Sequence, residues 1–166
     1  MQLPFKLGLF VALFVIAVDQ LTKLWALDAL LPYDPVAIFS GLNMTLAFNP
    51  GVAFSMFDDS GDMGRWLLSG LAIAVSVFLV IWLWRLVHEE RFIAGALGLV
   101  LGGALGNVID RIRLGHVVDF VDVYYKQSHW PAFNIADAAI TLGAILLVWD
   151  TLFHQEKQPA KKDNDE

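Results

Sequence analysis

The sequence predicts an all-α membrane protein, with four transmembrane helices and a small antiparallel β-sheet between the first and the second helix. Apolar residues make up 57% of the 166 residues and charged residues 17%, whereas a typical soluble domain is about 25% charged. Four apolar runs are each long enough to cross about 30 Å of hydrocarbon. The segment between the first two runs is instead rich in β-forming and turn residues. The chain is therefore expected to form one integral-membrane domain over residues 1–166.

Two of the apolar runs are almost free of charge, and the other two contain polar residues. The first run carries Asp19 and Lys23, and the fourth carries Asn134 and Asp137. The first run could also be a cleavable signal peptide, because Lys6 precedes it, but no small-residue cleavage site follows, so we expect a retained helix. The transmembrane spans are expected at about 7–25, 66–85, 92–109 and 131–149.

The β region is expected at about 33–56. Short runs of β-forming residues at 36–39, 43–48 and 52–54 are separated by Gly41 and by the turn signal Asn49-Pro50-Gly51. This pattern predicts a small antiparallel sheet. The polar residues 155–166 are expected to be a solvated tail.

The distribution of Lys and Arg predicts how the chain is oriented, since cytoplasmic segments carry the excess. With four spans both termini lie on one side, and that side would hold six basic residues against four on the other. We therefore expect cytoplasmic termini and an external, periplasmic β region. The six are Lys6, Arg85, Arg91, Lys157, Lys161 and Lys162, and the four are Arg65, Arg111, Arg113 and Lys126.

Composition excludes several kinds of chemistry. A formal charge of −6 argues against nucleic-acid binding, which needs a basic surface. The absence of cysteine excludes disulfides, thiolate metal sites and cysteine nucleophiles. The sequence His88-Glu89-Glu90 lacks the second histidine of a zinc protease motif, and His116 and His129 alone are weak candidates for a metal site. We expect neither a metal nor a cofactor.

Polar residues at membrane depth gather at one end of the predicted bundle. Asp19 lies six residues from Trp25 and Asp137 seven from Trp130, so both carboxylates lie about 9–10 Å of helix rise from the same membrane surface. Asn107, Asp110 and Arg111 lie at the outer end of the third span, and the glycines of that span predict a close-packing helix face. Ionisable residues at this depth suggest a functional site.

Each of these residues also has a structural interpretation. Asp19 and Lys23 are one turn apart and could neutralise each other, and Asp110 with Arg111 could hold the end of the third span. Asp119 and Asp137 have no local counter-charge. If these two converge, repulsion and desolvation would make them share a proton, as in aspartic proteases. A proton-coupled transporter and a non-catalytic assembly factor are the alternatives that remain open.

Five sequence blocks in order resemble the bacterial lipoprotein signal peptidases, also called signal peptidase II. The match extends over nearly the whole chain. The blocks are Asp19-Gln-Leu-Thr-Lys23, Asn49-Pro-Gly51-Val-Ala53-Phe54, Gly103-Ala-Leu-Gly106-Asn107-Val-Ile-Asp110-Arg111, Val118-Asp119-Phe120 and Phe133-Asn134-Ile-Ala136-Asp137.

This resemblance implies an intramembrane aspartyl endopeptidase of the bacterial inner membrane, with its active site near the periplasmic face. It would remove the signal peptide from diacylglyceryl-modified prolipoproteins, just before the lipid-bearing cysteine, and globomycin-type inhibitors would block it. The external sheet would correspond to the family's periplasmic cradle. The expected partners are lipidated prolipoproteins and membrane lipid, and we expect a monomer. The resemblance assigns catalysis to Asp119 and Asp137, and substrate binding or support to Asp19, Lys23, Asn49, Gly51, Asn107, Asp110, Arg111, Asn134 and Ala136.

Overall fold

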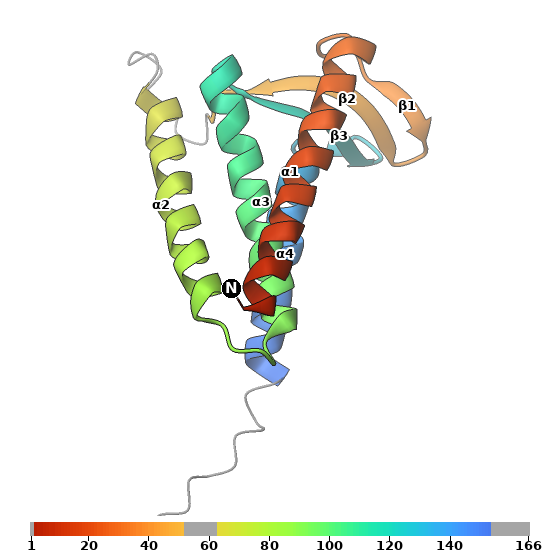
Figure 1. Ribbon diagram of the computed structural model, residues 1–166. Coiled ribbons are helices and arrows are strands. Elements are labelled where there is room, and N and C mark those ends of the chain that lie inside the picture. Colours follow the sequence, from red (N-terminus) through yellow and green to blue (C-terminus); the bar gives the residue numbers. More distant parts are fainter. Residues whose placement is uncertain (1, 52–62, 154–166) are drawn as a thin grey trace, which may run out of the picture.

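A computed structural model describes residues 2–51 and 63–153 and confirms the predicted fold class (Figure 1). It contains four helices that are long and apolar enough to cross a membrane. Pro4 lies in the first turn of the first helix, where its missing N–H costs no hydrogen bond, and Gly115 ends the third helix in the left-handed conformation. The helices are α1 (Leu3–Ala29), α2 (Met63–Arg85), α3 (Arg91–Leu114) and α4 (Ile135–Phe153).

An antiparallel sheet lies at one end of the helices, and its strand order is β1-β2-β3-β4. The first two strands, β1 (Val36–Phe39) and β2 (Leu42–Asn49), lie between α1 and α2, as predicted. The third predicted run, at 52–54, falls outside the described residues. The remaining strands, β3 (Val117–Tyr125) and β4 (Ser128–His129), come from the connection between α3 and α4 and lie outside the β region expected at about 33–56.

Strand β3 is rich in β-forming residues, since seven of its nine residues are Val, Phe or Tyr, and it pairs with a strand that is distant in the sequence. It lies antiparallel to β2, with Ala47 opposite Asp119 and Asn49 opposite Val117. Its apolar side chains Val118 and Phe120 pack with Ala26 at the end of α1. The sheet is thereby fixed to the bundle, and Asp119 is held between two buried apolar neighbours.

Helix α3 is the central helix of the bundle. Its most apolar stretch is 56% buried, against 17–28% for the other three helices. A methyl group added at Gly102 would lie 2.7 Å from the carbonyl oxygen of Ala12 in α1, and one at Gly103 would collide with the carbonyl of Ala136 in α4. The glycines of α3 therefore allow close helix packing, which confirms the packing face predicted from their spacing.

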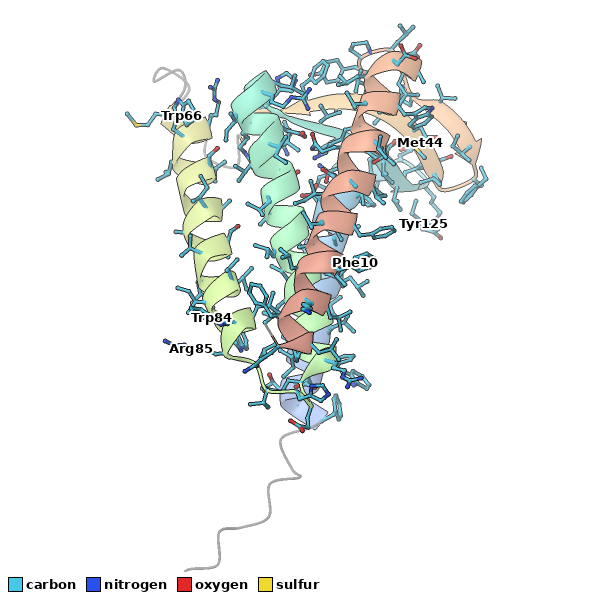
Figure 2. The ribbon with its side chains drawn as sticks, in the orientation of Figure 1. Phe10, Met44, Trp66, Trp84, Arg85 and Tyr125 are labelled. Carbon is cyan, nitrogen blue, oxygen red and sulfur yellow. The ribbon has the colours of Figure 1, made fainter. Side chains whose placement is uncertain are left out.

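Figure 1 shows that α1 begins and α4 ends at the end of the bundle opposite the sheet. We call these the terminal end and the sheet end. Trp66 and Trp84 are exposed and lie at the sheet end and the terminal end of α2 (Figure 2). Their separation of 18 residues corresponds to about 27 Å of helix, close to the thickness of the hydrocarbon core. Because tryptophan favours membrane interfaces, the two ends face opposite membrane surfaces.

Candidate active site

A buried ion cluster lies at the sheet end, between α1 and α3. The Lys23 ammonium contacts Asp19 Oδ2 at 2.9 Å and Asp110 Oδ2 at 2.8 Å, and all three side chains are at most 3% exposed. Backbone groups complete the cluster, because Ala136 N–H donates to Asp19 at 2.9 Å and Val118 N–H donates to Asp110 at 3.2 Å. Asp19 and Lys23 therefore form the ion pair that their spacing of one helical turn suggested. The cluster also connects α1 to α3, to the start of β3 and to the start of α4.

Gln20 belongs to the same cluster, although it is not among the site residues expected from the sequence. Its side-chain nitrogen donates to Asp110 Oδ1 at 2.8 Å and to Asp19 Oδ2 at 3.2 Å, and its oxygen accepts from Arg113 at 3.3 Å. Two buried carboxylates share one ammonium here, and Gln20 supplies neutral donors to both. Its position three residues before Lys23, on the same helical face, was the signal that could have identified it.

Asn107 connects this cluster to Asp137. Lys23 Nζ donates to Asn107 Oδ1 at 2.9 Å, and Asn107 Nδ2 donates to Asp137 Oδ1 at 2.8 Å. An ammonium can only donate, so the oxygen of the amide must face Lys23 and its nitrogen must face Asp137. The lysine thereby fixes the orientation of the group that contacts this carboxylate.

Asn134 and Asp137 together form the start of α4. Asn134 Oδ1 accepts the backbone N–H of Asp137 at 3.0 Å, and Asp137 Oδ2 accepts the backbone N–H of Asn134 at 3.3 Å. This reciprocal pair is a capping arrangement, which satisfies N–H groups that a helix start leaves free. It explains why α4 begins at Ile135, inside the span expected at 131–149, and it places Asp137 in the first turn.

Asp119 lies on strand β3 and interacts electrostatically with Asp137. Its side chain is 2% exposed and accepts from Asn134 Nδ2 at 2.6 Å and from Asn49 Nδ2 at 3.1 Å. Burial and, to a smaller extent, the negative charge of Asp137 raise the pKa of Asp119 from 3.8 to about 6. The two asparagine donors act in the opposite direction and moderate this rise. The two carboxyl groups therefore share one electrostatic environment.

The remaining candidate residues extend this network at its edges. Asn49 Oδ1 accepts the backbone N–H of Gly51 at 2.9 Å, and Gly51 has a φ of +91°, which favours glycine. Arg111 donates to the backbone carbonyl of Asn107 at 3.4 Å, a long hydrogen bond. The structure thus brings every candidate residue into one hydrogen-bonded network, which draws on α1, β2, α3, β3 and α4.

Asp137 also borders a groove on the outer surface of α4. The groove has a volume of about 420 Å³ and is mostly apolar. Because α4 carries exposed apolar side chains, this surface faces lipid, and a ligand could reach Asp137 laterally from the bilayer. Two adjacent carboxyl groups, one buried and one beside a groove, can exchange protons with a water molecule and a bound carbonyl group. The lining residues are Trp130, Phe133, Asp137, Ala138, Thr141, Leu142 and Ile145.

The histidines of the sheet end lie in other environments. His129 Nδ1 lies 2.8 Å from Asp122 Oδ1, and His116 packs against Phe48 with ring centroids 4.5 Å apart. Burial alone would raise the pKa of Asp122, but hydrogen bonds from His129 and Asn43 outweigh burial and lower it. Within residues 2–51 and 63–153, no three His, Asp or Glu side chains are grouped so as to hold a metal ion.

Comparison with known proteins shows close relatives over most of the chain. The family model described as signal peptidase (SPase) II matches residues 11–153. A lipoprotein signal peptidase of Teredinibacter turnerae is 55% identical over 143 residues, which cover 86% of this chain and 85% of the relative. One from Acinetobacter baumannii is 50% identical over 149 residues, covering 89% and 84%. A solved structure of a bacterial membrane enzyme superposes with a TM-score of 0.79 at 32% identity, covering 88% of this chain and 92% of that one.

Proposed function

The chain belongs to the signal peptidase II family of bacterial membrane peptidases, and from this premise we propose that it cleaves diacylglyceryl-modified prolipoproteins with a pair of aspartates. Cleavage would occur just before the lipid-bearing cysteine and would release the signal peptide. Membership of a peptidase family favours this function over the transporter and the assembly factor that the sequence alone left open.

The observation that carries the proposal is the bridge that Asn134 makes between two carboxyl groups. Its side chain donates to the carboxyl group of Asp119, and its backbone N–H donates to the carboxylate of Asp137, so the two groups are held in a fixed relation. Such a pair can act on a peptide bond without a cofactor. One carboxylate takes a proton from the attacking water, and the other, protonated, donates to the carbonyl oxygen.

The surroundings of the pair suit a substrate that arrives through the lipid. The groove beside Asp137 is lined mainly by apolar side chains such as Trp130, Leu142 and Ile145, so it can receive an acyl chain or the apolar part of a signal peptide. Trp66 is exposed at the sheet end of α2 (Figure 2), and Trp25 near the end of α1 and Trp130 directly after β4 are exposed as well, so all three mark the membrane interface there. A scissile bond beside a lipid-bearing residue belongs at this depth.

We further propose that the sheet end faces the periplasm and that both termini are cytoplasmic, in the inner membrane. Lys6, Arg85 and Arg91 lie in the helices at the terminal end, and the positive-inside rule places such residues on the cytoplasmic side. The sheet would then cover the site from outside, as a cradle. One copy of the chain supplies every residue of the network, which is consistent with a monomer.

The supporting roles follow from the contacts. Asn107, Asn134 and Asn49 orient the aspartates, while Asp19, Lys23, Asp110 and Ala136 hold the helices that carry them. Gly51 sets the turn that orients Asn49, and Arg111 lies beside Asn107, where it can contact substrate. Globomycin-type inhibitors would bind at the same pair of aspartates.

The test is a cleavage assay on the purified protein in detergent, with a diacylglyceryl-modified prolipoprotein and its unmodified precursor. We expect only the modified substrate to be cut, and mass spectrometry should find the lipid-bearing cysteine at the new amino terminus. Equal cleavage of both substrates, or a cut elsewhere, would contradict the proposed specificity.

A further inference from the structure

We propose that the two aspartates have different roles: Asp137 is the ionised member of the pair, and Asp119 carries the shared proton. Asn107 and Asn49 are positioning residues, each acting on one aspartate: Asn107 stabilises the charge of Asp137, and Asn49 limits how strongly Asp119 holds its proton. The inference rests on the proposed aspartyl peptidase function and adds the direction in which protons move.

Three features favour negative charge on Asp137. It lies in the first turn of α4, where the free N–H groups and the helix dipole stabilise an anion. Its two carboxylate oxygens accept from Asn107 Nδ2 and from the backbone N–H of Asn134. Its side chain also borders the groove, so water can reach it. Because Lys23 fixes the amide of Asn107, the donor that faces Asp137 cannot turn into an acceptor.

Asp119 lies in a setting that favours the protonated form. It is 2% exposed in the middle of a strand, between buried Val118 and Phe120, where no helix start contributes. Burial raises the pKa of Asp119 to about 6, in agreement with this position. A protonated carboxyl group still accepts at both oxygens, so the hydrogen bonds from Asn134 and Asn49 persist. Its O–H is then available to the carbonyl group of a substrate.

Other charged groups face the pair from α1 and α3. Lys23 lowers the pKa of Asp119 slightly, and Arg111 interacts electrostatically with both aspartates. Asp19 and Asp110 share the single positive charge of Lys23, which offsets one of their two negative charges. Strand β2 contributes the neutral side chain of Asn49. Lys23 and Arg111 would stabilise either aspartate in its ionised form. The position of Asp137 at the start of α4 and the burial of Asp119 therefore determine that Asp137 is the ionised one.

The proton movements then follow in a balanced sequence. The water oxygen bonds to the carbonyl carbon while Asp137 takes a water proton and Asp119 gives its proton to the carbonyl oxygen. Next, the carbon–nitrogen bond breaks, and the leaving nitrogen takes the proton from Asp137. Asp119 recovers a proton from a hydroxyl of the intermediate as the carbonyl re-forms. A carboxylic acid and an amine leave, and the pair returns to its starting state.

The experiment measures kcat/KM against pH for cleavage of the lipidated substrate by the wild type, Asn49→Ala and Asn107→Ala. This profile reports the essential groups of the free enzyme, with activity lost at low pH when the base is protonated and at high pH when the acid is ionised. Asn49→Ala removes a donor that lowers the pKa of Asp119, so the basic limb should move up by as much as about one pH unit. Asn107→Ala should instead lower kcat/KM and leave the basic limb in place, because Asp137 loses its side-chain donor while the contacts of Asp119 are kept.

Asn43→Ala is the matched control. Asn43 lies on β2 and donates to Asp122 on β3 at 2.8 Å, which repeats the Asn49–Asp119 pairing between the same strands but away from the site. Both limbs should stay in place in this variant. A general effect of removing an asparagine from the sheet would move its profile as well.

The opposite result overturns the inference. If Asn49→Ala shifts the acidic limb, Asp119 is the base and the roles are reversed, and an unmoved profile in this variant also contradicts the proposal. Asn49 is exposed, so this variant decides the question even if Asn107→Ala does not fold. Failure of the wild type to cleave the lipidated substrate would instead overturn the proposed function, so the two failures are distinguishable.

Discussion

The side-chain amide of Asn134 lies 2.6 Å from the carboxylate of Asp119, and through its oxygen it caps the helix that carries Asp137. One residue therefore determines both the position of a helix start and the relation between two carboxyl groups. Substitutions of Asn134 can change the stability of the protein and the cleavage rate separately. The helix cap needs a side-chain acceptor at this position, whereas the contact with Asp119 needs a side-chain donor.

Asn134→Ser should separate these two effects. Serine can still accept the backbone N–H of Asp137, whereas its shorter side chain cannot reach Asp119 in the same way. We expect Asn134→Ser to be more stable than Asn134→Ala by about 1 kcal/mol, while both variants cleave poorly. Thermal unfolding in detergent and the cleavage rate check the two parts. Equal stability of the two variants would show that the cap contributes little.

Lys23→Met should strongly destabilise the protein. The substitution leaves Asp19 and Asp110 buried without their cation, and breaking a buried ion pair in this way costs about 3–5 kcal/mol. Denaturant unfolding of the purified protein measures the loss. Lys6→Met is the control, because Lys6 is exposed and its replacement should change stability by less than about 0.5 kcal/mol. Similar stabilities for the two variants would contradict the structural role of the cluster.

Gly102→Ala and Gly95→Ala compare two glycines of the same helix. A methyl group at Gly102 would lie 2.7 Å from the backbone oxygen of Ala12, so α1 and α3 must separate, at a cost of about 1–3 kcal/mol. At Gly95 nothing lies within 4 Å, and alanine should stabilise the helix by up to about 1 kcal/mol. Melting temperatures of the two variants should therefore move in opposite directions. A stabilising Gly102→Ala would exclude the close contact.

The stability of the protein should depend on pH through Asp119. Its pKa is raised from 3.8 to about 6 on folding, so between these values the folded protein binds this proton more tightly than the unfolded chain does. Stability from this group is therefore complete below about pH 4 and is lost as the pH rises to about 6, by at most about 3 kcal/mol.

Asp119→Asn isolates this contribution from the other titrating groups. Its stability relative to the wild type should increase between about pH 4 and about pH 6 and stay constant above. Unfolding curves at several pH values measure the difference. A difference that stays flat or falls over this range would show that folding does not raise the pKa of Asp119.

Local sequence pattern was enough to predict the helices and the first two strands. Each span is a continuous apolar run, and 36–39 and 43–48 are rich in β-forming residues between turn signals. Strand β3 was not predicted, although its Val, Phe and Tyr residues favour a strand, and its pairing of Asp119 with Ala47 joins segments far apart in the sequence. The start of α4 was placed too early, since apolar length does not show that Asn134 is a cap.

The residues of the candidate site could be selected from the sequence, but their partners could not. Asp119 and Asp137 were selected because no local counter-charge explains them. Their partners are amides from β2, α3 and the residue before α4. Such contacts depend on how distant segments pack together, which the local sequence pattern does not reveal. Gln20 was missed for the same reason, because its donors become necessary only when Asp110 is brought beside Asp19.

The most direct test of the central claim compares Asp119→Asn and Asp137→Asn with the wild type in single-turnover cleavage of the lipidated prolipoprotein. Each variant should lose about 10²- to 10⁴-fold in rate, because each removes one proton-transfer group. Asp122→Asn is the matched control on the same strand as Asp119 and should cleave at a rate close to that of the wild type. A wild-type rate in either Asp119→Asn or Asp137→Asn, in protein that is folded by the same criteria, would contradict the account.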